Sequence, residues 1–220
     1  GSGAIALQAA ERVGSEGRVV GSDIAASMLR IARQNAVKRG KTNLTFLEMD
    51  AEHLGFSDAS FDIVTCGFSL FQFPNMRQAL KEMERVVKRG GQIGLSNWGT
   101  GYFSPVADMQ RKLFQDFGLR PLLTNPITFK HDELQMLLEW AGLTELQLES
   151  DEMEVWFKDP QAVWDYNMSM GPFPVMLRRQ LTADQSESLH ERFIEKVSAI
   201  ASPQGVRCTF HLLYALARKT

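Results

Sequence analysis

The sequence predicts an α/β fold in which a mostly parallel sheet carries helices on both faces. Three observations support this prediction: helical and strand patterns alternate along residues 1–100, the turn Gly1-Ser2-Gly3 directly precedes a helical segment, and acidic residues follow two of the predicted strands. Such alternation is typical of parallel sheets, because a parallel crossover needs a connecting helix.

The first hundred residues supply the alternating elements. The predicted strands are 18–21, 44–47, 61–66 and 92–96, and the predicted helices begin at Ala4, Ala25 and Met76. The third helix is amphipathic, because apolar residues recur from Met76 to Val87 at spacings of three and four, and it is expected to end at Gly90-Gly91.

The second half is less regular. Predicted helices cover 105–117 and 132–141, a loop surrounds Pro121 and Pro126, and strands cover 143–157 and 207–217. The mainly helical block 159–201 precedes the last strand, which predicts an antiparallel last strand and a helical cover outside the sheet. We expect one domain over 1–220, with a ligand-binding core at 1–100 and a substrate-side half at 101–220.

Composition excludes several classes of function. The net charge is −2 and the pI about 6.1, and the basic segment 77–89 is interrupted by Glu82 and Glu84. We interpret that segment as a solvated helix face and expect no nucleic-acid partner. Cys66 and Cys208 are too few for a disulfide framework, and no apolar run is long enough to span a membrane, so a cytoplasmic location is expected. No cluster of His, Asp and Glu has metal-ligand spacing, so no metal is expected.

The glycine turn and Asp23 predict a nucleoside site. Gly3 opens a helix twenty residues before Asp23, which ends the next strand. Glycine lets the backbone approach a ligand, the helix start offers free N–H groups, and a carboxylate at this spacing accepts hydrogen bonds from ribose hydroxyls. This pattern alone fits NAD, FAD or S-adenosylmethionine.

Four ordered motifs narrow the choice. The segments 22–29, 49–54, 61–66 and 80–91 resemble successive blocks of class I S-adenosylmethionine-dependent methyltransferases, with closest resemblance to the ubiquinone and menaquinone biosynthesis group. Arg89 stands where that group usually has proline, which affects the stiffness of the turn. The resemblance is strong over 1–100 and looser over 130–220, and it implies a Rossmann-like doubly wound fold.

The resemblance implies a set of cofactor-binding residues. Gly1 and Gly3 would border the methionine and ribose parts, and Asp23 would bind the ribose hydroxyls. The adenine would be lined by Ile24 and Met28 and hydrogen-bonded by Asp50 and Ala51, and the methyl end would lie near Gly67 and Phe68. Packing residues or surface turns are the alternative interpretation of these positions.

The resemblance also bears on the first residues. The family's first motif has an acidic residue and three alternating glycines at the end of its first strand, and Gly1 and Gly3 match the last two glycines. We therefore expect that native residues before Gly1, including a central first strand, are missing here, which would leave unpaired strand edges and exposed apolar faces. The alternative is that the opening residues come from cloning.

The methyl acceptor is expected to bind among apolar residues of the second half of the chain and Phe71. The cover contains Tyr166, Met170, Met176 and other large side chains, and the predicted pocket residues are Phe71, Trp98, Phe103, Trp164, Met168 and Phe173. Such side chains suit an adaptable apolar pocket, but ordinary core packing is an equal alternative. No catalytic base stands out, and Tyr102 and His131 are the candidates.

The predicted function is transfer of a methyl group from S-adenosylmethionine, which yields S-adenosylhomocysteine, to a small, partly apolar acceptor. The accepting atom is O, N or C, attacked in line. One alternative is a catalytically silent relative that works through protein contacts. Another is a nicotinamide-dependent dehydrogenase, which would not be expected to have an antiparallel last strand between its neighbours. The oligomeric state is left open.

Overall fold

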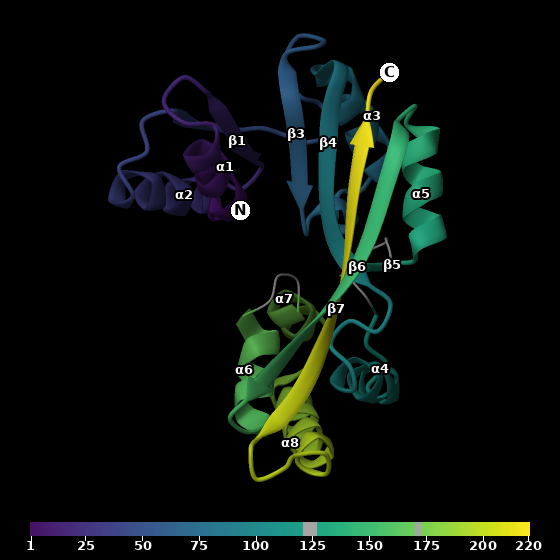
Figure 1. The fold of residues 1–220 in the computed structure, drawn as a ribbon. Coiled ribbons are helices and arrows are strands. Elements are labelled where there is room, and N and C mark those ends of the chain that lie inside the picture. The colour runs from purple at the N-terminus through teal and green to yellow at the C-terminus, as the bar shows by residue number, and fades with distance from the viewer. Residues whose placement is uncertain (121–126, 170–172) are drawn as a thin grey trace. The chain divides into compact units, whose positions relative to one another are not determined.

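The computed structural model describes residues 1–120, 127–169 and 173–220 (Figure 1). Its helices are α1 (Ala4–Arg12), α2 (Ala26–Lys38), α3 (Met76–Val86), α4 (Val106–Asp116), α5 (His131–Trp140), α6 (Pro160–Ser169), α7 (Phe173–Gln180) and α8 (Ala183–Ser198), with a short 3-10 helix at Leu70–Gln72. Its strands are β1 (Val19–Asp23), β2 (Leu44–Glu48), β3 (Phe61–Gly67), β4 (Val87–Gly99), β5 (Thr128–Phe129), β6 (Thr144–Phe157) and β7 (Val206–Arg218). The predicted loop at Pro121 and Pro126, and Met170, lie outside the described residues.

The described strands form two sheets. β1 and β2 are parallel, with Asp23 opposite Glu48, and the second sheet has the order β3-β4-β7-β6, with β5 parallel to the end of β4. β7 runs antiparallel to β4, because Gly90 hydrogen-bonds to Lys219 at one end whereas Gly99 lies against His211 toward the other. The predicted α/β class with an antiparallel last strand is confirmed, and the position of β7 between β4 and β6 argues against the dehydrogenase alternative.

β1 and β3 each have one unpaired edge within the described chain. β1 pairs with β2 alone, and β3 pairs with β4 alone. Apolar side chains on these strands are exposed, with Val20 at 36% and Ile63 at 58%. The expectation that residues before Gly1 are missing stays a prediction.

The boundary between α3 and β4 differs from the prediction. The helix ends at Val86 and the strand starts at Val87, so Gly90 and Gly91 belong to the strand and the predicted helix end is wrong. The physical reason lies at the other end of the chain. Gly90 N–H donates to the Lys219 carbonyl over 2.7 Å, and Lys219 N–H donates to the Gly91 carbonyl over 3.1 Å. Glycine pairs of this kind usually end a helix, but here Gly90 and Gly91 form part of a strand because they hydrogen-bond to Lys219, which is distant in the sequence.

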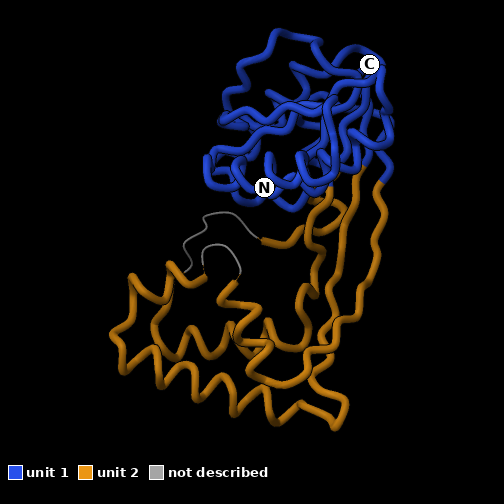
Figure 2. Tube along the Cα trace, turned by 90° about the vertical axis from the view of Figure 1, so that its left-hand side faces the viewer, with its two compact units in different colours: residues 1–95, 136–147, 216–220 blue, residues 96–135, 148–215 orange. Residues whose placement is uncertain are grey.

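The described chain divides into two compact units (Figure 2). Unit 1 comprises 1–95, 136–147 and 216–220, and unit 2 comprises 96–135 and 148–215. β4, β6 and β7 contribute residues to both units. A small core of unit 1 lies under the glycine turn and consists of Leu7, Leu29, Ala32, Ala36 and Phe46. The expectation of one domain over the whole chain stays a prediction.

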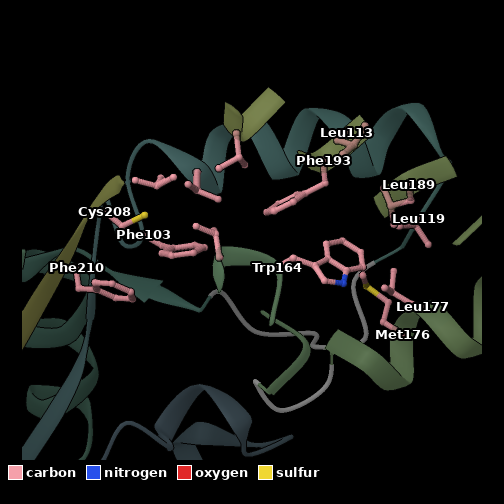
Figure 3. Packing of buried hydrophobic residues seen from close by; sticks show 14 residues of the cluster. Phe103, Leu113, Leu119, Trp164, Met176, Leu177, Leu189, Phe193, Cys208 and Phe210 are labelled. Carbon is pink, nitrogen blue, oxygen red and sulfur yellow. The ribbon is translucent and has the colours of Figure 1, made fainter. Parts of the chain in front are cut away.

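The predicted helical cover is formed by α6, α7 and α8, between β6 and β7. Its buried side chains pack with those of α4 and β7 into one apolar cluster in unit 2 (Figure 3). The two ends of the cover, at Phe157 and Gly205, lie close together. A Cβ atom at Gly205 would collide with the Phe157 carbonyl oxygen. Gly205 also has a φ of +113°, which favours glycine.

Candidate functional site

The glycine turn in unit 1 packs closely against the core of that unit. Gly3 begins α1 with a φ of +86°, and a Cβ atom there would lie 3.1 Å from Phe46 and 3.2 Å from Ala32. Glycine is therefore required on both conformational and steric grounds. The turn is also fixed from outside, since the Asn35 side-chain amide donates to the Ser2 carbonyl oxygen over 3.1 Å.

Asp23 ends β1 beside this turn. Its Oδ1 accepts a hydrogen bond from the Ala25 N–H over 2.7 Å. The side chain is 23% exposed. The carboxylate is therefore fixed at the strand end and remains accessible, as a ribose-binding role needs. That role stays a prediction.

The two residues predicted to line the adenine follow Asp23. Ile24 is 71% exposed, which is high for a large aliphatic side chain, and Met28 is half-buried in the first turn of α2. An exposed isoleucine beside a carboxylate fits a surface that a flat apolar ring could cover.

Asp50 follows the end of the neighbouring strand, β2. The backbone brings it close to Asp23, because the Met49 N–H donates to the Asp23 carbonyl oxygen over 3.1 Å. Asp50 Oδ1 accepts from the Glu52 N–H over 2.9 Å, and its Oδ2 lies 3.4 Å from His53 Nδ1. These hydrogen bonds lower the pKa of Asp50, with the Glu52 N–H the larger cause, so the group is an ionised acceptor at neutral pH. Ala51, which lies between Asp50 and Glu52 in the sequence, is half-buried.

Sequence reasoning missed the residue that holds the next loop. The Arg85 guanidinium donates to the carbonyl oxygens of Leu54 and Phe56 over 2.8 and 2.7 Å and pairs with Asp58 and Glu82. The interpretation of 77–89 as a solvated face is therefore wrong for Glu82 and Arg85, whose side chains are 13% and 30% exposed. Helical spacing could indicate only the pair with Glu82, because the other partners of Arg85 lie about thirty residues earlier in the chain.

Gly67 ends β3, in the larger sheet, and Phe68 follows it. Phe68 has a φ of +50°, an uncommon conformation for a bulky residue. Just before them, Cys66 is buried and its Sγ lies 3.2 Å from Ser69 Oγ, and burial raises the pKa of this thiol. A strained residue at a strand end is compatible with a ligand-binding role, which stays a prediction.

The residues predicted for the acceptor pocket have two kinds of environment. Phe103 and Trp164 are 2% and 9% exposed and belong to the buried cluster of unit 2, where Figure 3 shows Phe103 near Cys208 and Phe210. The half-buried members of the set pack against that cluster, namely Trp98, Met168 and Phe173. Phe71 lies in unit 1, in the 3-10 helix, and is 8% exposed. Packing explains their burial, and a role in binding stays a prediction.

An aromatic cluster in unit 2 surrounds Tyr102. We define it as Trp98, Tyr102, Phe103, Phe157, Tyr166 and Phe210, whose neighbouring ring centroids lie 4.5 to 6.1 Å apart. Burial, followed by a hydrogen bond to Tyr166, raises the pKa of Tyr102. The phenol is therefore neutral at physiological pH and is suited to donate or accept a hydrogen bond rather than to act as a phenolate base.

The other catalytic candidate lies in a separate hollow of unit 2. His131 begins α5, and its Nε2 lies 2.6 Å from Ser150 Oγ. His211 Nδ1 lies 3.2 Å from Glu152 Oε1. These four residues line a hollow of about 470 Å³, together with Gly99, Thr100, Phe129, Lys130, Asp151, Leu212 and Leu213. Successive β7 residues point to opposite faces, so His211 and Phe210 of the aromatic cluster lie on different faces.

One buried amide adjoins this face without a partner. Asn97 on β4 is 0% exposed, and neither of its amide atoms has a hydrogen-bond partner. It lies two residues before Gly99 and hence on the same face of the strand. Sequence reasoning missed it, because a strand pattern does not reveal whether a buried amide is satisfied.

Two of the expectations concern metal ions and membrane spans. Within 1–120, 127–169 and 173–220, no group of three or more His, Cys, Asp and Glu is arranged to hold a metal ion. Over the same ranges, no helix has both the length and the apolar character needed to cross a membrane.

The comparison with known families decides the classification. The sequence profile of the ubiE/COQ5 methyltransferase family matches residues 1–115, slightly more than half of the chain and every candidate cofactor residue. The chain belongs to the ubiE/COQ5 methyltransferase family. The resemblance inferred from the motifs is therefore confirmed.

Individual relatives agree with this classification. The ubiquinone/menaquinone biosynthesis C-methyltransferase UbiE of Xanthomonas oryzae pv. oryzae is 38% identical over 143 residues, which cover 63% of this chain and 54% of the relative. The UbiE of Xanthomonas campestris pv. campestris gives the same values. This member of the ubiE/COQ5 family thus spans about half the length of the curated relatives it matches.

Solved structures support the fold. A candidate methyltransferase of Bacillus halodurans C-125 superposes with a TM-score of 0.61 at 21% identity and covers 92% of this chain and 83% of its own. Phosphoethanolamine N-methyltransferase 2 of Haemonchus contortus was solved with phosphomonomethylethanolamine and S-adenosylhomocysteine. It superposes with a TM-score of 0.58 at 17% identity, and the match covers 100% of this chain and 47% of that protein's chain. At these identities the likeness indicates the shared Rossmann-like fold of the ubiE/COQ5 family member.

Proposed function

We propose that this protein transfers the methyl group of S-adenosylmethionine to a ring carbon of a small, partly apolar aromatic acceptor, a precursor of the ubiquinone or menaquinone type. One observation carries the proposal: Gly3, Asp23 and Asp50 meet at the ends of the glycine turn, β1 and β2, inside the segment matched by the family profile. The accepting carbon is taken from the name of the relatives, C-methyltransferase.

The residues present fit S-adenosylmethionine. Gly3 allows the turn to pack directly on Phe46 and Ala32 at the start of α1, and Asp23 and Asp50 offer carboxylate oxygens at two neighbouring strand ends. In this proposal Asp23 accepts from the ribose hydroxyls, Asp50 accepts from the adenine amine, and the Ala51 N–H donates to a ring nitrogen. When bound, the cofactor supplies a methyl group already activated on a sulfonium, which suits an in-line displacement.

The remaining side chains orient the partners. Ile24 and Met28 cover the adenine, and Gly67 and Phe68 lie toward the methyl end. The candidate base stays open, because the raised pKa of Tyr102 favours a neutral phenol.

Calorimetry with S-adenosylmethionine and S-adenosylhomocysteine tests the cofactor assignment. Asp23→Ala should weaken binding by about 1–3 kcal/mol, since a charged hydrogen-bond partner is lost. Asp62→Ala is the matched control, because Asp62 also belongs to a strand of unit 1 but pairs with Lys88 on an exposed surface. Absence of cofactor binding by the unmodified protein would support the silent-relative alternative and overturn the enzyme assignment. Unchanged affinity in folded Asp23→Ala protein would overturn the ribose role alone.

A transfer assay tests the acceptor class. The protein is incubated with methyl-labelled cofactor and three acceptors of similar size: a prenylated hydroquinone, a phenol ether and an aromatic amine. Label on a ring carbon of the hydroquinone is the expected result. Label only on the amine nitrogen would overturn the proposed acceptor class and leave methyl transfer itself established.

A further inference from the structure

Glu52 lies two residues after Asp50, in the loop between β2 and β3, and its backbone holds the Asp50 carboxylate. The Glu52 N–H donates to Asp50 Oδ1 over 2.9 Å. The other oxygen, Oδ2, lies 3.4 Å from Nδ1 of His53, whose side chain is 76% exposed. Oδ1 is thus held by the loop itself, whereas Oδ2 has the weaker contact and is the oxygen that can accept from a bound molecule.

The rest of Glu52 is anchored to the start of α3. Its Oε1 accepts from the Asn75 N–H over 2.7 Å, and its carbonyl oxygen accepts from Gln78 Nε2 over 3.2 Å. Asn75 caps this helix, because its side chain accepts from the Gln78 N–H over 3.1 Å. The helix dipole favours a carboxylate at this end. Glu52 therefore connects Asp50 with a helix that begins more than twenty residues later in the chain.

The second half of the same loop is held by other residues of α3. Glu82 Oε2 accepts from the Leu54 N–H over 2.7 Å, and Arg85 donates to the Leu54 carbonyl oxygen over 2.8 Å. All of these residues belong to unit 1. The loop thus has two separate anchors on α3, and the one made by Glu52 acts directly on Asp50.

We propose that Glu52 is a positioning residue that gives the cofactor site its preference for a base with an amine at the adenine position. The inference rests on the proposed function, in which Asp50 accepts from the adenine amine. Because the Glu52 N–H is anchored to α3 and holds Oδ1, it also fixes where Oδ2 lies. A fixed acceptor favours a base with a donor at one place on the ring.

The same arrangement disfavours a base that has an oxygen in place of the amine. Two acceptors would then face each other, and a held carboxylate cannot turn away to relieve this contact. The hydrogen bond from Glu52 also lowers the pKa of Asp50. At neutral pH the carboxylate therefore has no proton that it could donate to the oxygen of such a base.

Three nucleosides test the inference: S-adenosylhomocysteine, its purine analogue without the amine, and its hypoxanthine analogue with an oxygen there. Calorimetry gives each dissociation constant, and the readout is the ratio of the constant of an analogue to that of S-adenosylhomocysteine. The variants are Glu52→Ala, Glu52→Gln and Gln78→Ala. Glu82→Ala is the matched control, because Glu82 and Glu52 each accept one backbone N–H between the loop and α3 over 2.7 Å.

The unmodified protein should bind the purine analogue about 10-fold more weakly than S-adenosylhomocysteine, the loss of one hydrogen bond to a carboxylate, and the hypoxanthine analogue more weakly still. Glu52→Ala should reduce the purine ratio to about 3-fold, and Gln78→Ala to about 5-fold, because Asp50 is held less firmly. Glu52→Gln keeps an oxygen for the Asn75 N–H and should restore most of the ratio. Glu82→Ala should lower the melting temperature and leave the ratio unchanged.

Two results would overturn the inference. One is an unchanged ratio in Glu52→Ala, and the other is an equal fall in Glu82→Ala, which would assign the effect to general loosening of the loop. If Glu52→Ala does not fold, Gln78→Ala decides in the same way, because it removes the donor to the Glu52 carbonyl oxygen.

The unmodified protein separates this inference from the proposed function. If it binds all three nucleosides equally well, the inference and the adenine role of Asp50 are wrong, while cofactor binding is established. If it binds none of them, the proposed function is wrong, and the inference that rests on it fails as well.

Discussion

The Asn35 side-chain amide donates to the Ser2 carbonyl oxygen over 3.1 Å and so ties the glycine turn to α2, thirty-three residues further along the chain. The turn is short and has exposed surroundings, and this contact comes from a different element. It restricts the backbone where the proposed cofactor site needs a fixed shape.

Asn35→Ala should therefore weaken S-adenosylmethionine binding without unfolding the protein. The expected loss is about 1 kcal/mol, the typical value of one neutral hydrogen bond, seen as a higher dissociation constant in calorimetry. Asn43→Ala is the matched control, because Asn43 also donates to backbone carbonyl oxygens, those of Ala10, Gly14 and Gly17. The control should lower the melting temperature and leave affinity unchanged. Equal affinity in both variants would contradict the role given to Asn35.

Gly3→Ala should lower the free energy of unfolding by about 1–2 kcal/mol for the left-handed backbone, plus a further amount for contact with Phe46. Gly14→Ala separates the two causes, since Gly14 has a φ of +68° but open space where a Cβ would be placed. Urea unfolding measures both variants. Phe46→Leu should reduce the difference between them, and equal losses in the two alanine variants would show that the contact with Phe46 has no effect.

The network around Arg85 predicts a stability change in acid. The hydrogen bond from Arg85 lowers the pKa of Glu82 below its usual 4.5, so the unfolded chain binds this proton more readily than the folded chain. The stabilisation is complete above about pH 4.5 and is lost as the pH falls through the lower folded pKa. Denaturant unfolding from pH 7 to pH 3 measures it. Glu82→Gln should flatten this dependence, Glu187→Gln on α8 should preserve it, and an unaltered profile in Glu82→Gln would refute the assignment.

Asn97→Leu should make the protein more stable. Both amide atoms of Asn97 are buried without a partner, and replacing such a group by an apolar side chain of similar size removes a penalty of about 1–2 kcal/mol. Chemical denaturation measures the gain. Asn43→Leu should have the opposite effect, because it deprives three carbonyl oxygens of their donor. A clear loss of stability in Asn97→Leu would mean that the amide has a partner in solution.

Most elements could be predicted because their signals are local. The helix at Ala4, the strand that ends at Asp23 and the amphipathic helix at Met76 each follow from spacing within about a dozen residues. The end of that last helix could not, because Gly90 and Gly91 pair with Lys219 at the far end of the chain. The two-residue strand β5 is too short to have a period of its own.

In the candidate site, too, features with local sequence signals were predictable and contacts between distant residues were not. The positions of Gly3, Asp23 and Asp50 were predictable, because a helix start and two parallel strand ends fix them. The contacts that hold them in place were not, since Asn35 and Arg85 act across about thirty residues and resemble ordinary surface residues in the sequence. The packing of Tyr102 and Tyr166 against the same two rings, Phe103 and Phe210, was equally hidden, because sixty-four residues separate the two tyrosines.

The neighbouring ends of the cover, at Phe157 and Gly205, have an evolutionary consequence. An insertion whose ends meet can be lengthened, shortened or exchanged while the strands on either side keep their register. The cover is expected from the sequence to contribute to the acceptor pocket, so replacement of this one segment would change acceptor recognition while the residues proposed for the cofactor, at the start of the chain, stay the same. Chimeras that exchange 158–204 between relatives therefore test whether the cover sets acceptor choice.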